Sequence, residues 1–187
     1  MLSRTFIRAS TSLRPSATST PFKRSFSATP AIMVREGDSI PSVDLFENSP
    51  GNKIDLSKEL SSGKGVIIGV PAAFSPSCSE QHIPGYIGSD KLKEAGKVFV
   101  ISVNDAFVMK AWAKDLDSSS VSGIRFLADP TGEFTRALDV EFDATPLLGN
   151  KRSKRYAVET ENGKVKKVAI EPDPAGVTVS SAEKFLS

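Results

Sequence analysis

The chain has 187 residues, and its 24 lysines and arginines against 22 aspartates and glutamates give a formal net charge of +2 at neutral pH. This length predicts one domain, or two small ones, with a core large enough to fold without disulfide bonds. The only cysteine, Cys78, excludes an internal disulfide, and with the only histidine, His82, it cannot complete a structural zinc site, so we expect neither a metal nor another cofactor.

The first 34 residues differ in composition from the rest of the chain. Residues 1–34 carry five basic and no acidic side chains, and they are rich in serine and threonine. A helix over their first half would place hydrophobic side chains on one face and arginines on the opposite face. We therefore predict a mitochondrial transit peptide over residues 1–34, import into the matrix, and a folded domain over residues 35–187; the alternative is a plain disordered tail.

The remaining sequence excludes two kinds of partner. Residues 35–187 carry 19 basic against 22 acidic side chains, a net charge of −3, and offer no overall positive charge to a nucleic acid. No apolar run approaches the roughly 20 residues that a membrane-spanning helix needs. We expect a chain that neither binds nucleic acid nor inserts into a membrane.

The first half of the domain contains two strongly apolar segments. Lys64–Ala72 and Val98–Val103 are rich in β-branched residues and are typical of strands buried on both faces. Between them, Pro76–Glu94 can form a helix with an interruption at Pro84-Gly85. Strand, helix and strand in this order predict a parallel crossover unit. Before this unit we expect a strand at Val43–Phe46 and a short helix at Leu56–Leu60, capped by Asp55 or Ser57.

The second half predicts further strands and helices. A helix begins after Asn104 or Asp105 and runs through Leu116, and a β-hairpin turns at Asn162-Gly163, the preferred two-residue turn. The other expected elements are a strand at Ile124–Ala128, a helix at Glu133–Leu138, hairpin strands at Arg155–Thr160 and Lys164–Ile170, and a helix at Ser181–Leu186. Together they predict an α/β fold with a mixed central sheet flanked by helices.

The chemistry concentrates at Cys78, just past the carboxyl end of the first buried strand. Ser75 is a preferred helix-capping residue and Pro76 suits the first helical position, which places Cys78 in the first turn. Cysteines in such a position ionise more readily than a free thiol, because unpaired backbone N–H groups and the helix dipole favour an anion. The alternative is a small buried hydrophobic residue. The polar residues around Cys78 favour the reactive thiolate.

His82 lies one helical turn after Cys78, so the two side chains could share one face of a helix. The pair suggests a Cys–His dyad of a hydrolase or acyltransferase. The alternative is a histidine that only orients or caps its neighbours, because no third group that would orient a dyad is evident near it in sequence. A further possibility is a non-enzymatic thiol redox sensor.

Four separated segments carry recognisable motifs. The chain around Cys78 reads Pro71-x-x-Phe74-Ser75-Pro76-x-Cys78-x-x-x-His82-x-Pro84-Gly85, and the other segments are Ser102–Phe107, Leu127–Gly132 and Gly149–Tyr156. The first is similar to the active-site signature of the peroxiredoxins, and the other three resemble the type-five branch of that family. The resemblance covers residues 34–187. It implies a thioredoxin-like fold and a thiol-dependent peroxidase that reduces hydrogen peroxide and alkyl hydroperoxides through a sulfenic acid on Cys78.

The resemblance also implies a role for each site residue. Cys78 attacks the peroxide, and Ser75 hydrogen-bonds both the sulfur and the bound peroxide. Arg155 favours the thiolate and holds a peroxide oxygen, whereas the alternative for Arg155 is a surface salt bridge. Pro71 shields the sulfur. Cys78, Ser75 and Arg155 are thus the expected catalytic residues, and the same three with Pro71 bind substrate.

One departure from the type-five pattern concerns the second half-reaction. Many members carry a resolving cysteine near the C-terminus, where this chain has Val179. The resemblance therefore implies a one-cysteine mechanism, in which glutathione with glutaredoxin, or thioredoxin, reduces the sulfenic acid from outside. It also implies a homodimer that packs around the active-site ends, using Phe46 and Phe107, unless these two residues belong to the core.

Overall fold

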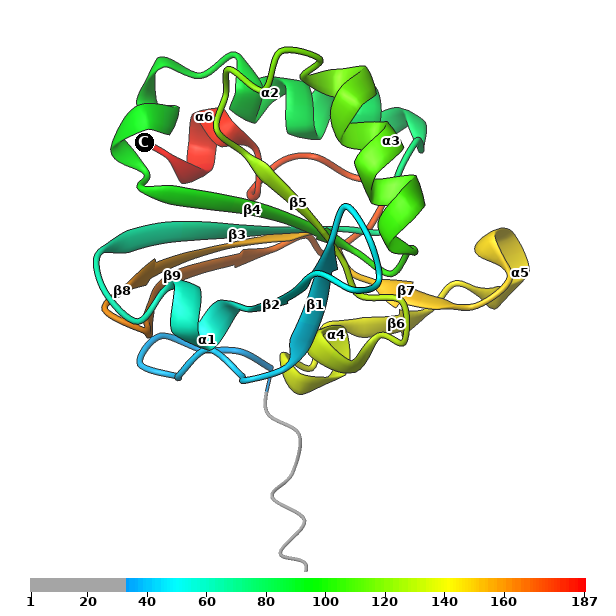
Figure 1. The fold of residues 1–187 in the computed structure, drawn as a ribbon, viewed down its shortest axis with the longest axis horizontal. Coiled ribbons are helices and arrows are strands. Elements are labelled where there is room, and N and C mark those ends of the chain that lie inside the picture. The colour runs from blue at the N-terminus through cyan, green and yellow to red at the C-terminus, as the bar shows by residue number, and fades with distance from the viewer. Residues whose placement is uncertain (1–32) are drawn as a thin grey trace, which may run out of the picture. The chain divides into compact units, whose positions relative to one another are not determined.

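The computed structural model describes residues 33–187, in which a seven-stranded mixed sheet forms the centre (Figure 1). Three central strands run parallel, and the strands at both sides run antiparallel to their neighbours. The order across the sheet is β2 (Lys53–Asp55), β1 (Asp44–Glu47), β5 (Arg125–Ala128), β4 (Lys97–Ser102), β3 (Lys64–Val70), β8 (Tyr156–Glu161) and β9 (Lys164–Ile170).

Helices cover both faces of this sheet (Figure 1). On one face lie α2 (Ile83–Ile87), α3 (Ala106–Leu116) and α6 (Ala182–Phe185), and on the other lie α1 (Leu56–Glu59) and α4 (Glu133–Ala137). The remaining elements are the π-helix η1 (Ser77–His82), the 3-10 helix η2 (Asp90–Glu94), a small sheet of β6 (Glu141–Asp143) and β7 (Lys151–Ser153), and α5 (Thr145–Leu148). Within residues 33–187, no helix combines the length and the hydropathy needed to cross a membrane.

The central strand β3 contributes to a hydrophobic core on each side of the sheet. Val66 and Ile68 join a cluster that includes Trp112, whereas Ile67 joins a second cluster that includes Phe134. Side chains alternate between faces along a strand, so a strand buried on both faces is apolar throughout. This explains why the segment from Lys64 shows a continuous apolar run.

The predicted mixed sheet with flanking helices is confirmed, and several local signals are confirmed with it. The Asp105 side chain accepts hydrogen bonds from the backbone N–H groups of Phe107 and Val108 and caps α3. Asn162 and Gly163 both have positive φ angles, 51° and 76°, as the predicted tight turn between β8 and β9 requires. The strands β2, β6 and β7 and the helix α5 were not predicted, because they are only three or four residues long and too short to show a period.

The segment from Pro76 to Glu94 is helical with one break. It begins as η1 and continues as α2, and then Ser89 is extended before η2 begins, so the predicted interruption at Pro84-Gly85 is found four residues later. Proline has no backbone N–H, so Pro84 cannot donate to the carbonyl one α-helical turn earlier. The backbone N–H of Ile83 bonds to the Cys78 carbonyl, the wider spacing of a π-helix. The chain therefore stays helical from Cys78 to Ile87.

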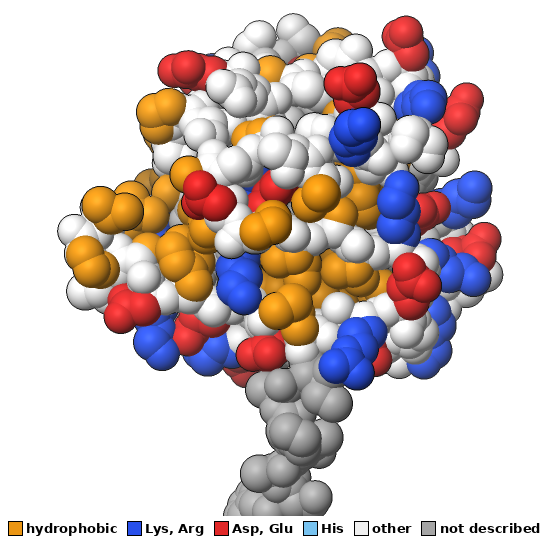
Figure 2. Space-filling view, turned by 180° about the vertical axis from the view of Figure 1, so that it is seen from behind, with side chains coloured by type: hydrophobic (Ala, Val, Ile, Leu, Met, Phe, Trp, Pro, Cys, Tyr) orange, Lys and Arg blue, Asp and Glu red, His pale blue; other side chains and the backbone are white. Residues whose placement is uncertain are grey.

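Hydrophobic side chains also gather on one outer face of the molecule. Figure 2 shows them spreading across the face opposite to the view of Figure 1, from the side on which α5 lies. Large hydrophobic residues exposed in the described part of the chain include Phe74, Phe107, Leu147 and Leu148, with Phe107 63% and Leu147 88% exposed. Exposed apolar residues that gather on one face indicate an interaction surface.

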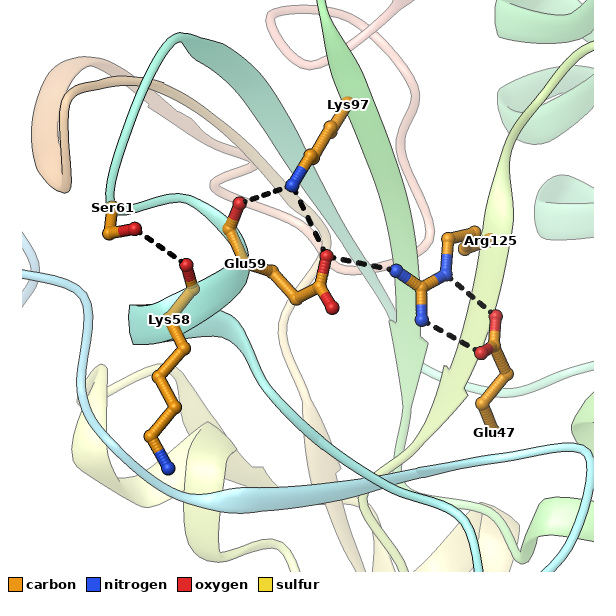
Figure 3. A network of polar contacts seen from close by, with 6 residues as sticks. All are labelled: Glu47, Lys58, Glu59, Ser61, Lys97 and Arg125. Carbon is orange, nitrogen blue, oxygen red and sulfur yellow. Dashed lines mark hydrogen bonds and ion pairs between the residues drawn. The ribbon is translucent and has the colours of Figure 1, made fainter.

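A network of ion pairs links β1, β5, β4 and α1 (Figure 3). Arg125 on β5 donates two hydrogen bonds of 2.8 Å to the Glu47 carboxylate on β1, and its third nitrogen lies 3.1 Å from Glu59 on α1. Lys97 on β4 pairs with the same Glu59 at 3.3 Å. Arg125 thus joins three separate elements in a partly buried site.

Substituting methionine for Arg125 is expected to lower the free energy of unfolding by about 1–2 kcal/mol, because a two-point arginine–carboxylate contact exceeds an ordinary surface pair. Urea unfolding at low and high salt measures this, and high salt should shrink the difference. The control is Lys53→Met, which removes an ion pair whose side chains are 61% and 53% exposed and should leave stability nearly unchanged. Equal losses in the two variants would contradict the account.

Candidate active site

The loop between β3 and η1 places Cys78 next to the ends of β3 and β4. The backbone N–H of Ala73 donates to the Asn104 side-chain oxygen over 3.1 Å, and the Ser102 hydroxyl donates to the same oxygen over 2.7 Å. Phe74 adopts a positive φ of 61°, which turns the loop into the helix. Cys78 is consequently fixed just past the carboxyl end of the central strand, as predicted, and its side chain is fully buried.

Arg155, which directly precedes β8, contacts the Cys78 sulfur. Its Nη1 group donates to Sγ over 3.3 Å, and the arginine is only 2% exposed. A guanidinium remains protonated, so it brings a fixed positive charge and a donor to the sulfur. Burial alone would fit a plain hydrophobic cysteine, but a buried arginine aimed at the sulfur does not. The geometry also excludes the surface salt bridge considered for Arg155.

The Ser75 side chain neither caps the helix nor bonds to the Cys78 sulfur, although both contacts were predicted. Its hydroxyl donates to the Ala72 carbonyl over 3.0 Å and does not cap the helix, because that carbonyl lies within reach inside the loop. Within residues 33–187, no hydrogen bond joins Ser75 Oγ to the Cys78 sulfur. The predicted bond to the sulfur is therefore not formed. The hydroxyl proton is committed to Ala72, and the oxygen remains able to accept.

A cavity of about 260 Å³ lies beside these residues. Pro71, Ser75 and Arg155 line it, which brings three of the four predicted substrate-binding residues to one place. Cys78 does not line the cavity; its sulfur lies behind Arg155, which contacts it. The rest of the wall is mostly apolar and comprises Pro76, Phe142, Ala144, Leu147, Leu148, Pro174 and Ala175, with Ser77 and Asp173. A small polar group bound at Arg155 and Ser75 would thus have an apolar surface around its other end.

His82 is buried behind Arg155 and does not act as a base toward Cys78. Its Nδ1 lies 3.2 Å from Arg155 Nη1, and its Nε2 lies 3.0 Å from the Ser180 carbonyl oxygen. Burial and then the Arg155 charge lower the pKa of His82 to about 4, so the ring is neutral near pH 7. Since Arg155 can only donate, Nδ1 is the acceptor and Nε2 carries the proton. The Nδ1 lone pair is already occupied, so the geometry does not support the Cys–His dyad.

Two residues near His82 carry no sequence motif. Ser180 contacts His82, and the Glu171 carboxylate accepts a hydrogen bond from the Ser180 hydroxyl over 2.8 Å. Ser180 is 98 positions away from His82 and Glu171 is about 90 away, and a lone serine or glutamate in a polar tail gives no signal. Glu171 directly follows β9 and lies opposite Arg155, and its backbone N–H donates to the Arg155 carbonyl. The pairing register of the predicted hairpin was therefore the only signal that could have placed Glu171 near the site.

The pH dependence of stability tests the buried state of His82. The ordinary pKa of 6.5 falls to about 4 on folding, so between these values the unfolded chain binds a proton that the folded chain excludes. The full stability is therefore present above pH 6.5, and about 3 kcal/mol is lost as the pH falls to about 4.

Denaturant unfolding across this pH range measures the loss. His82→Gln, although less stable at neutral pH, should lack this part of the acid dependence because glutamine does not titrate. Parallel stability curves for the two proteins would show that His82 is accessible to protons in the folded state.

The remaining predicted residues occupy different environments. Val179 is 45% exposed on the segment before α6. Phe107 is exposed at the start of α3, whereas Phe46 is half-buried and packs against the core. Of the two aromatic residues considered for a subunit contact, only Phe107 offers a free surface.

Comparison with known proteins gives consistent matches. The redoxin family model matches residues 35–186. Peroxisomal membrane associated protein 20 of Schizosaccharomyces pombe is 49% identical over 158 residues, covering 83% of this chain and 99% of that protein. Peroxiredoxin-2C of Oryza sativa is 39% identical, covering 82% and 96%. The structure of peroxiredoxin 5 from Alvinella pompejana superposes with a TM-score of 0.73 at 38% identity, covering 82% and 96%. These matches confirm the thioredoxin-like fold.

The mitochondrial localisation predicted from residues 1–34 is contradicted. The Schizosaccharomyces pombe relative, by its name, is associated with the peroxisomal membrane, which points to the peroxisome. The prediction rested on the composition of a segment of which nearly all lies outside the described residues. Composition does not determine which import receptor binds a segment, so an acid-free, arginine-bearing leader was insufficient.

Proposed function

The chain belongs to the redoxin family and, within it, to the peroxiredoxins, which are thiol-dependent peroxidases, and we propose that Cys78 is its peroxidatic residue, with Arg155, Ser75 and Pro71 completing the site. The observation that carries this assignment is the 3.3 Å hydrogen bond from buried Arg155 to the Cys78 sulfur. A chain with a single cysteine offers no other thiol for the reaction.

The proposed reaction begins with attack of the Cys78 thiolate on the nearer oxygen of a hydroperoxide. A sulfur lone pair forms the S–O bond, the O–O bond breaks, and the leaving oxygen takes a proton to become water or an alcohol. The sulfur is oxidised to sulfenic acid and the peroxide is reduced. Negative charge moves from sulfur to oxygen in this step, so donors that stay in place stabilise the transition state.

Arg155 and Ser75 have complementary parts in this step. Arg155 Nε is buried without a hydrogen-bond partner among the described residues, which leaves a donor for a peroxide oxygen. Because the Ser75 proton is committed to Ala72, the Ser75 oxygen accepts the O–H of the peroxide. The backbone N–H of Cys78 supplies a further donor, and Pro71 limits the access of water to the sulfur.

The cavity beside the site supports organic hydroperoxides as well as hydrogen peroxide. Its polar end contains Arg155 and Ser75, while Phe142 and Leu147 belong to its apolar wall. An alkyl group placed against that wall would gain about 25 cal/mol for each Å² removed from water. Hydrogen peroxide has no such group and would bind through the polar end alone.

Recycling of the sulfenic acid requires an external thiol. The position of many resolving cysteines is occupied by Val179, and Cys78 is fully buried, which disfavours a direct bridge between two copies. Glutathione with glutaredoxin and thioredoxin are the candidate reductants.

The experiment that tests the function has two halves. Reduced protein is mixed with peroxide in a stopped-flow instrument, and the oxidised protein is then recycled separately by each of the two reductant systems. Fast oxidation followed by turnover with at least one system supports the proposal. Oxidation without turnover in either system contradicts the external-thiol mechanism, and absence of oxidation contradicts the assignment of Cys78.

The exposed apolar face supports a homodimer. Leu147 and Leu148 are exposed and line the cavity beside the active site, and Phe107 is exposed at the start of α3. A second copy packed there would cover this surface and lie next to the site. Sedimentation of the wild-type chain and of Phe107→Ser tests the contact.

The peroxidase domain is proposed to span residues 35–187. The relationship to the Schizosaccharomyces pombe protein supports a peroxisomal location. Fractionation of cells that express the full chain, with marker proteins for peroxisomes and for mitochondria, tests this location.

A further inference from the structure

Arg155 is held in place by few partners, although the proposed chemistry depends on its position. Its Nη1 group donates to the Cys78 sulfur over 3.3 Å and to His82 Nδ1 over 3.2 Å, and its Nε has no partner. Within residues 33–187, Arg155 forms no ion pair. The sulfur changes its chemical state during the reaction, so His82 is the lasting partner that orients the guanidinium.

His82 can orient Arg155 only in one of its two neutral tautomers. Nδ1 must be without a proton to accept from Arg155, and Nε2 must then carry the proton. The Ser180 carbonyl oxygen, 3.0 Å from Nε2, accepts a hydrogen bond from the Nε2–H group and thereby favours this tautomer. The Tyr86 hydroxyl donates to the same carbonyl over 2.7 Å and fixes it from the other side.

Ser180 is in turn fixed by a buried carboxylate. Glu171 Oε1 accepts from the Ser180 backbone N–H over 2.9 Å and from the Ser180 hydroxyl over 2.8 Å. Thr178 donates its backbone N–H and its hydroxyl to the same carboxylate, both over 2.6 Å. Glu171 is 2% exposed. Burial raises its pKa, but the bonds from Thr178 and Ser180 outweigh burial and lower it to about 2, so the carboxylate is ionised near neutral pH.

The charge of Glu171 is not used in a direct ion pair. Glu171 and Arg155 lie opposite each other where β9 and β8 meet, since the Glu171 N–H donates to the Arg155 carbonyl. Their side chains nevertheless form no ion pair in the described part of the chain. They are joined instead through Ser180 and His82, and this buried chain of polar groups ends at the Cys78 sulfur.

We propose that Glu171 is a positioning residue for the peroxidase reaction: through Ser180 and His82 it holds the Arg155 guanidinium against the Cys78 sulfur. The proposal rests on the function assigned above, because it takes Cys78 and Arg155 as the reacting site. It makes Glu171 and Ser180 part of the apparatus that positions Arg155, although neither residue has to touch the peroxide.

The change in thiolate absorbance in Glu171→Gln has opposite signs if Glu171 positions Arg155 and if Glu171 acts only through its charge. Glu171→Gln removes a negative charge near the sulfur. If Glu171 acted only through its charge, the variant would stabilise the thiolate and raise its absorbance at 240 nm at neutral pH. If Glu171 positions Arg155, the variant lowers that absorbance and slows single-turnover oxidation by peroxide about tenfold, within the range for residues coupled through one hydrogen-bond network.

The chain suits this measurement. Cys78 is the only cysteine, and burial raises the pKa of both tyrosines, Tyr86 and Tyr156, so tyrosinate does not contribute near neutral pH. His82 is the only histidine, so its ¹⁵N signals can be assigned without ambiguity. The proposal predicts the Nε2-protonated tautomer in the wild type and a mixture of tautomers in Glu171→Gln.

A matched pair of variants keeps the test valid even if Glu171→Gln does not fold. Ser180→Ala and Thr178→Val each remove one hydroxyl that donates to Glu171, but only the Ser180 hydroxyl also contacts His82, with its oxygen 3.2 Å from Nε2. We expect Ser180→Ala to slow Cys78 oxidation several-fold and Thr178→Val to change it less than twofold. Equal effects of the two variants, or a rise in thiolate absorbance in Glu171→Gln, would overturn the proposal.

A double-mutant cycle completes the experiment. In an Arg155→Met background, Glu171→Gln should change the oxidation rate no further, because there is no guanidinium left to position. A full effect in that background would also overturn the proposal. The thiolate absorbance is measured without peroxide, so it tests the positioning role even if the wild-type chain fails to reduce peroxide, a result that would count against the proposed function alone.

Discussion

Replacing Cys78 by serine abolishes thiol-dependent peroxide reduction, with an expected loss of at least about 10⁴-fold, the scale on which loss of a nucleophile acts in enzymes. A serine hydroxyl is protonated at neutral pH and is not oxidised by peroxides. No other cysteine in the chain can substitute for Cys78. The measurement is the consumption of hydrogen peroxide by the purified protein with excess thiol and both reductant systems.

The control for this variant is Gln81→Ala, which changes an exposed residue of the same helix and should retain most of the activity. Circular dichroism and a thermal melt establish that Cys78→Ser is folded, since serine is close to cysteine in size. Peroxide consumption by Cys78→Ser at the wild-type rate would remove the assignment of Cys78.

Replacing Arg155 by methionine slows oxidation of Cys78 by an expected 10²- to 10³-fold, the effect of removing one preorganised donor from a site where charge develops. Two contributions act in the same direction. The sulfur loses the donor at 3.3 Å, and the peroxide loses the free Nε group. Stopped-flow oxidation of the reduced protein measures the rate, and absorbance at 240 nm measures the thiolate present before mixing.

Two further variants separate the charge of Arg155 from its shape. Arg155→Lys keeps the charge but lacks the planar fork, so it should recover only a small part of the rate. Lys154→Met removes a neighbouring charge that is not directed at the sulfur, and it should leave the rate within about twofold. Equal rates for Arg155→Met and the wild type would mean that Arg155 has no part in the reaction.

The sequence was sufficient wherever the signal was local or periodic. The apolar run from Lys64 to Ala72 predicted the central strand, and Asn162-Gly163 predicted the hairpin that brings β9 alongside β8. The cap predicted at Asn104 or Asp105 located the start of α3, and the structure shows that Asp105 is the cap. Arg155 was placed near Cys78 only through the resemblance to peroxiredoxins, because 77 residues separate them and no period connects them.

Other features depend on tertiary contacts and could not be predicted. The Ser75 hydroxyl has a choice between a helical N–H, the sulfur and the Ala72 carbonyl, and only the folded loop determines which is in reach. Glu171 and Ser180 reach His82 because α6 and the segment before it fold back over η1. The very short strands β6 and β7 form because they pair with each other, not because of their own composition.

The central claim is that Cys78 alone carries out the oxidation step, and a titration of reduced protein with hydrogen peroxide in the absence of any other thiol tests it most directly. The account predicts that one peroxide is consumed per chain, and that mass spectrometry after trapping with dimedone finds the sulfenic acid on Cys78. Consumption that continues beyond one equivalent with Cys78 unmodified, or no consumption at all, would contradict the account.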